Sequence, residues 1–145
     1  MKLAELIKER GDAQKRIEHL RNRLNSNALR QEKRKTPEDP EDILKELEEL
    51  FTRLEYLILK INLTNNQYNL VQLLAKRDTL FRKISIYRDF LSTASGGVHQ
   101  YTKTEIAILP NVNIPKLQSY LDVLAKEYRE LEIQIQEKNW TIDVE

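Results

Sequence analysis

Six polar residues occur where the helical repeat of this chain otherwise places apolar ones: Arg10, Asn27, Asn62, Asn65, Arg77 and Asp78. In packed helices, such residues fix register and oligomer state at some cost in stability. If the segments on either side of residues 66–69 run antiparallel, Asn62 and Asn65 approach Arg77 and Asp78. An asparagine layer with an Arg–Asp pair can satisfy its own hydrogen bonds, so a structural cluster is favoured over a small pocket for a polar ligand.

The two histidines, His19 and His99, lack the spacing of a metal site. Metal sites in helical bundles use inward carboxylates and Glu-x-x-His pairs, which are absent here. Glu18, Lys15 and Arg16 surround His19, and His99 lies in the loop that contains Gly96 and Gly97, so both side chains are expected to face solvent. The chain also lacks cysteine, a glycine-rich phosphate loop and a Gly-x-Ser-x-Gly elbow. We therefore expect no metal, cofactor or catalytic residue, and enzyme is the minority hypothesis.

The overall charge of the chain does not indicate a class of binding partner. The net charge is +1, from 24 basic and 23 acidic residues, so no overall field attracts nucleic acid or an anionic membrane. Basic residues do gather at the end of the first segment and in its loop: Lys15, Arg16, Arg21, Arg23, Arg30, Lys33, Arg34 and Lys35. No aromatic residues interleave with them and acids follow, so a solvated surface is favoured over a nucleic-acid interface.

No targeting or membrane segment is recognisable. The first residues lead directly into a charged amphipathic pattern, and no window approaches 18 uncharged apolar residues. A cytoplasmic location is expected.

Four stretches, residues 2–28, 41–64, 70–94 and 114–139, carry apolar residues spaced three and four apart. Three glycines and four prolines in 145 residues suit long helices better than sheets. Each stretch spans roughly 35–40 Å at the helical rise of 1.5 Å per residue. We predict one mainly α domain over residues 1–145, with four long helices in an up-down antiparallel bundle or in coiled-coil-like hairpins.

The second stretch has an unusually wide apolar surface. Its seam is flanked on one side by Leu44, Phe51 and Ile58, seven residues apart, and on the other by Tyr56, Leu59 and Leu63. A helix that is apolar nearly all round needs more than one neighbour. This favours a bundle or an oligomer over an isolated hairpin.

Several residues predict where these helices begin and end. Pro40, beside acidic residues, suits the first turn of the second helix. Asn69 with Gln72 matches an N-terminal capping box, and Asn113 is a candidate cap for the fourth helix. The Ser95-Gly96-Gly97 sequence predicts a break after the third helix.

Two features near the C-terminal half are not helical. Residues 101–109 are β-prone and end at Pro110. A single strand is unstable alone, so this segment is expected either to pack as an extended strap along the helices, which is favoured, or to pair with its counterpart in another subunit. Trp140, after the last helix, is expected to form a hydrophobic lid.

Short strings along nearly the whole chain also resemble a known family. They include Arg16-Ile17-Glu18-His19-Leu20 and the sequence that follows to residue 28, and the blocks at 31–32, 38–40, 61–65, 74–78, 101–106 and 135–140. Together they resemble the septicolysin-like family of small bacterial proteins. The resemblance implies that the asparagine strings and the Arg77-Asp78 pair belong to a shared pattern, and the family name implies a haemolysin. The turn at residues 66–69 departs from the longer Asp-Gly connection of that family.

Three functions follow from these observations. The leading hypothesis is a cytoplasmic, self-associating helical structural or interaction module, a homo-oligomer stabilised by the 101–109 segment. The alternative is a ligand-binding or enzymatic bundle that uses Asn62, Asn65, Arg77 and Asp78. The third is a membrane-active protein, suggested only by the family name, since residues 54–63 contain charges and are too short to cross a bilayer.

Overall fold

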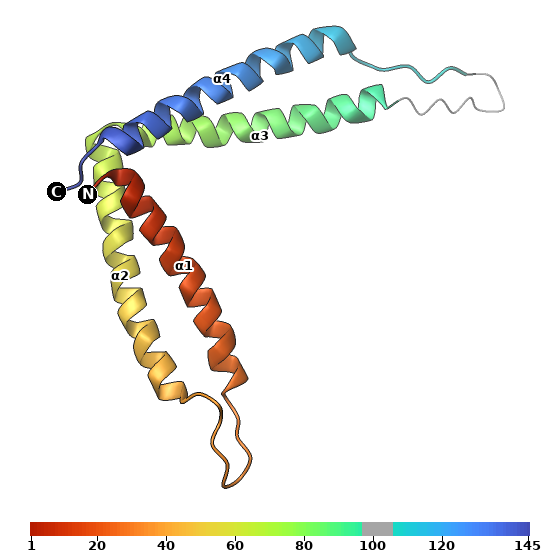
Figure 1. Cartoon of the computed structure of the whole chain (residues 1–145). Coiled ribbons are helices and arrows are strands. Elements are labelled where there is room, and N and C mark those ends of the chain that lie inside the picture. Colours follow the sequence, from red (N-terminus) through yellow and green to blue (C-terminus); the bar gives the residue numbers. More distant parts are fainter. Residues whose placement is uncertain (97–105) are drawn as a thin grey trace. The chain divides into compact units, whose positions relative to one another are not determined.

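The computed structural model describes residues 1–96 and 106–145 and contains four long helices in this part of the chain (Figure 1). They are α1 (Leu3–Ser26), α2 (Pro40–Gln67), α3 (Leu70–Ser95) and α4 (Ile114–Thr141). The described residues form no sheet strand, so the predicted mainly α fold of four long helices is confirmed. Every observed helix end lies within three residues of its predicted position.

The chain divides into two compact units. The first comprises residues 1–68 and 138–145, and the second comprises residues 69–137. The first therefore holds α1, α2 and the last turn of α4, and the second holds α3 and the rest of α4. That the whole chain is one domain stays a prediction, and each unit is described by itself.

In the first unit, α1 and α2 form a helical hairpin (Figure 1), and buried apolar side chains form a seam between them. Leu20 is fully buried against Ile43 and Leu47. Outside this seam, two ion pairs join the helices, Arg16 with Glu46 at 2.8 Å and Arg53 with Glu9 at 2.7 Å, and a third joins Arg23 of α1 to Glu38 in the loop before α2. Residue numbers rise along α1 as they fall along α2, so the helices are antiparallel. The paired side chains are about one-third to two-fifths exposed, so they specify this register more than they stabilise it.

The two ends of the chain are joined within the first unit. The Leu3 amide donates to the Ile142 carbonyl at 3.0 Å, and the Val144 amide donates to the Met1 carbonyl at 2.9 Å. Lys2 and Asp143 form the isolated antiparallel bridge between these bonds, and their side chains form an ion pair at 2.9 Å. This pairing holds the residues after α4 beside the start of α1.

Trp140 does not form the expected lid. Its side chain is 60% exposed, whereas Ile142, two residues later, is buried. Because Trp140 is still on α4, its position follows the helical repeat and directs it away from the core. The extended residues after the helix reverse that direction and bury the isoleucine instead.

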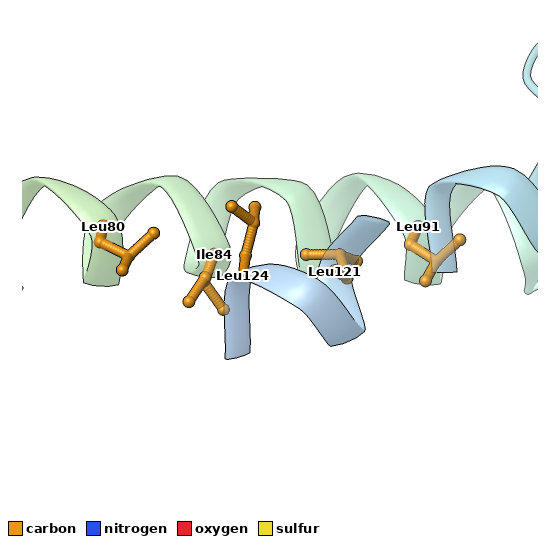
Figure 2. Packing of buried hydrophobic residues seen from close by; sticks show 5 residues of the cluster. All are labelled: Leu80, Ile84, Leu91, Leu121 and Leu124. Atoms are coloured by element: carbon orange, nitrogen blue, oxygen red, sulfur yellow. The ribbon is translucent and has the colours of Figure 1, made fainter. Parts of the chain in front are cut away.

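The second unit is built on a hairpin of α3 and α4. Figure 2 shows Leu121 and Leu124 of α4 lying among Leu80, Ile84 and Leu91 of α3. Outside this cluster, Lys76 pairs with Glu127 at 3.1 Å, and the Lys83 ammonium donates to the Tyr120 hydroxyl at 2.7 Å. These contacts again require antiparallel helices.

Helices α2, α3 and α4 begin within one residue of their predicted starts, and two of the three predicted capping features at these starts are confirmed. Pro40 occupies the first turn of α2, where Asp39 accepts a hydrogen bond from the Glu41 amide at 3.0 Å. Asn113 accepts one from the Lys116 amide at 3.1 Å at the start of α4. The capping box at Asn69 is wrong: its side chain caps nothing, and its backbone is left-handed with φ of 59°. Only two residues join α2 to α3, and asparagine tolerates the left-handed conformation that this turn needs.

The end of α3 agrees with its prediction, whereas the segment that follows does not. The helix ends at Ser95, as expected from the glycines that follow. Residues 101–105 of the predicted β-prone segment lie outside the described part of the chain. Ile106, Ile108 and Leu109 are between 58% and 76% exposed, so this end of the segment does not pack as a strap along the helices. Pairing between subunits stays a prediction.

Candidate functional site

The structure distributes the predicted polar cluster over two units. Asn62 and Asn65 lie on α2 in the first unit, and Arg77 and Asp78 lie on α3 in the second. Asn62 and Asp78 are exposed, while Asn65 and Arg77 are partly buried. That the four residues form one cluster stays a prediction.

Within the second unit, Arg77 has a partner that the sequence did not suggest. Its guanidinium lies 3.4 Å from Glu132 of α4 and 3.3 Å from the adjacent Asp78. The nearer Glu132 oxygen is buried and lacks a hydrogen bond, so attraction to Arg77 is what offsets its burial. The arginine therefore joins α3 to α4.

Asn27 is buried and has a structural role. It follows the last residue of α1, its side-chain amide donates to the Arg23 carbonyl at 2.7 Å, and its side-chain oxygen accepts from the Glu38 amide at 3.1 Å. Both hydrogen bonds lie where the loop returns towards α2. Arg10, the other polar residue of the α1 seam, is partly buried.

The remaining candidates add no chemical site to the described residues. His19 is exposed, as predicted, and His99 lies outside the described part of the chain. Within residues 1–96 and 106–145, no three histidine or carboxylate side chains are grouped to hold a metal. Of the basic residues near the first loop, Arg16, Arg21 and Arg23 are paired with acids of the same hairpin.

The most prominent surface feature is an apolar face on α2, which we call the α2 outer face. It consists of side chains that are between 39% and 57% exposed: Leu44, Phe51, Tyr56, Ile58, Leu59 and Leu63. The opposite side of the same helix is buried through Ile43, Leu47, Leu57 and Ile61. The wide apolar surface predicted for this segment is thus present, and only part of it is covered within one chain.

Cationic groups lie over the ring of Tyr56, one of the two aromatic residues of this face. The Arg53 guanidinium lies 5.0 Å from the centre of the Tyr56 ring, and the Lys60 ammonium lies 5.9 Å from it. Both cations are themselves engaged, Arg53 by Glu9 and Lys60 by the Glu145 carbonyl at 2.9 Å. The hydrogen bond from Arg53 lowers the pKa of Glu9 and raises the pKa of Arg53. The charges beside Tyr56 are therefore largely compensated, which leaves its ring available for apolar contact.

A second aromatic cluster, formed by Tyr87 of α3 and Tyr120 of α4 around Lys83, was not predicted from the sequence. The Lys83 ammonium lies 5.8 Å from the Tyr87 ring centre and 5.2 Å from that of Tyr120, in addition to its hydrogen bond with the Tyr120 hydroxyl. This hydrogen bond raises the pKa of Lys83. The spacing of Lys83 and Tyr87, four residues apart on one helix, was the available signal.

The comparisons with known proteins give a family and a structure. No curated protein matches this chain. The chain is similar to a crystal structure described as that of a functionally unknown conserved protein from Corynebacterium diphtheriae, with 34% sequence identity and a TM-score of 0.93 over 100% of this chain and 99% of that chain. Residues 10–144 match the model of a family of unknown function, DUF6847.

These findings correct the resemblance to the septicolysin-like family, which neither comparison supports. That resemblance depended on short polar strings. Such strings occur on the exposed surfaces of many unrelated helices, because an exposed position accepts many different polar residues. The membrane-active hypothesis came only from that family name. Among the described residues, no helix is both long and apolar enough to cross a membrane. The chain belongs to DUF6847, a family of unknown function.

Proposed function

We propose that this protein is a self-associating helical interaction module, in which the α2 outer face packs against the same face of a second copy. The observation that supports this proposal most strongly is the six half-exposed apolar side chains on one helix. Exposed apolar side chains gathered on one helix in this way mark interaction sites. The cytoplasmic location expected from the sequence stays a prediction.

The area of the α2 outer face fits a modest interface. If a large apolar side chain exposes about 180 Å² when free, six half-exposed ones offer roughly 500 Å² per copy, or about 1,000 Å² in a pair. Stable interfaces bury from about 1,200 Å² upwards, with neighbouring side chains contributing the remainder. We therefore expect reversible association with a dissociation constant in the micromolar range.

The charges favour a second copy of this chain in an antiparallel orientation. A net charge of +1 gives little repulsion between copies. Residues 41–50 of α2 carry five acids and one lysine, whereas residues 51–67 carry Arg53, Glu55 and Lys60. Antiparallel pairing sets the acidic half of one helix against the less acidic half of the other, while parallel pairing would oppose the two acidic halves.

Asn62 acquires a role within this proposal. It is exposed and lies four residues after Ile58 and three after Leu59, so it is a polar residue within the apolar face. A single asparagine in a helical interface favours the register in which it can hydrogen bond. We expect Asn62 to select how the two copies align.

A spin-labelling experiment tests which surface is shared. The chain has no cysteine, so a Glu55→Cys variant carries one label among Phe51, Ile58 and Leu59. The control, Asp12→Cys, places the label at an exposed position of α1 in the same unit. The proposal predicts strong dipolar coupling between labels on different copies for the Glu55 variant and weaker coupling for the Asp12 variant. Absence of coupling between copies in both variants, at concentrations well above micromolar, would refute self-association.

A further inference from the structure

A groove runs between α3 and α4 in the second unit, on residues that the proposed association does not use. Its volume is about 300 Å³, and its lining consists of Phe81, Ile84, Ser85, Arg88, Asp89, Ala125, Tyr128 and Arg129. Small-molecule sites begin near this size, at about 300 Å³. The groove can therefore hold a ligand of one or two rings.

One part of the groove is apolar and aromatic. Ile84 belongs to the buried core between the two helices, and Tyr128 packs against the same core. The rings of Phe81 and Tyr128 are 5.9 Å apart and tilted by 44°, and Phe81 is 61% exposed. An aromatic pair with an open face can accept a further ring by offset or edge contact.

The rest of the groove carries unpaired positive charge. Among residues 1–96 and 106–145, neither Arg88 nor Arg129 forms an ion pair, in contrast to Arg77 of the same unit, which is paired with Glu132. Asp89 offers one carboxylate, so the two guanidinium groups leave one positive charge in excess. Guanidinium groups bind carboxylates through paired, charge-assisted hydrogen bonds.

We propose that this groove binds a small aromatic acid. The ring of the ligand packs against Phe81 and Tyr128, and its carboxylate pairs with Arg88 and Arg129. The groove and the α2 outer face lie in different units, so this proposal does not depend on self-association.

Calorimetric titration with 2-naphthoate tests the proposal, and uncharged 2-naphthamide serves as the matched probe. Replacing both groove arginines, Arg88→Gln with Arg129→Gln, should weaken naphthoate binding by about tenfold or more and leave naphthamide binding nearly unchanged. The control Arg30→Gln with Arg34→Gln removes the same charge from the exposed first loop and should bind naphthoate like the wild type.

A variant that fills the groove separates this site from general charge effects. Ala125→Leu enlarges a partly buried groove residue and should weaken the binding of both probes, with helix content by circular dichroism confirming the fold. The proposal is overturned if the wild type does not bind naphthoate. Equal losses in the two double-arginine variants would also overturn it, because binding would then follow net charge.

Discussion

The Asn27 side chain provides a quantitative test of how the first hairpin is closed. In the Asn27→Ala variant, the Arg23 carbonyl loses its side-chain donor and the Glu38 amide loses its acceptor. Asn27 is only 6% exposed, so water does not readily replace these partners. With about 1 kcal/mol for each hydrogen bond and a further penalty for a buried group left unsatisfied, the expected loss of unfolding free energy is about 2–3 kcal/mol.

Urea denaturation followed by tryptophan fluorescence measures this loss of unfolding free energy in the first unit, where Asn27 lies. Trp140 is the only tryptophan of the chain and belongs to the first unit, like Asn27. A lower midpoint with an unchanged slope would show that stability alone has changed. The matched control is Asn25→Ala, since Asn25 is exposed in the last turn of α1 and should change stability by less than about 0.5 kcal/mol. Equal losses in the two variants would refute the role assigned to Asn27.

Three further predictions concern packing and charge. Leu20→Ala should lower the unfolding free energy by about 2–5 kcal/mol in the same assay, because the fully buried side chain leaves a cavity in the hairpin seam. The lowered pKa of Glu9 beside Arg53 stabilises the fold above the usual glutamate pKa, and this contribution is lost as pH falls through the lowered pKa. Glu9→Gln should therefore flatten the decline of the urea midpoint on the acidic side. Tyr120→Phe removes the hydrogen bond from Lys83 at an exposed site and should shift the thermal midpoint only slightly.

The helices were predictable because their signals are local. The spacing of apolar residues predicted which side of each helix is buried. Pro40, Asn113 and the residues after Ser95 predicted helix ends that the structure confirms. Asn69 shows the limit of such signals. Asparagine favours both a helix cap and a left-handed turn, and only the tight path between α2 and α3 selects the second.

The features that the sequence did not predict depend on residues far apart in the chain. The bridge between Lys2 and Asp143 joins the two ends of the chain, and no local pattern marks either residue as its partner. The groove needs Arg88 and Arg129 on different helices. Only once the helices are paired is it visible that neither arginine has an ion-pair partner in the described part of the chain. The apolar width of α2 was evident in the sequence, whereas the structure was needed to show which of its side chains stay uncovered.

Self-association through α2 is the central proposal, and sedimentation velocity over a range of concentrations tests it most directly. Phe51 and Phe90 are each 50% exposed, on α2 and α3 respectively, so Phe51→Ser and Phe90→Ser remove equal apolar surface from different helices. About 100 Å² per side chain corresponds to roughly 2.5 kcal/mol per copy, enough to weaken a dimer by more than about tenfold. The account predicts a concentration-dependent dimer for the wild type and for Phe90→Ser, and a monomer for Phe51→Ser under the same conditions. A wild type that stays monomeric well above micromolar concentration, or equal weakening by the two variants, would contradict it.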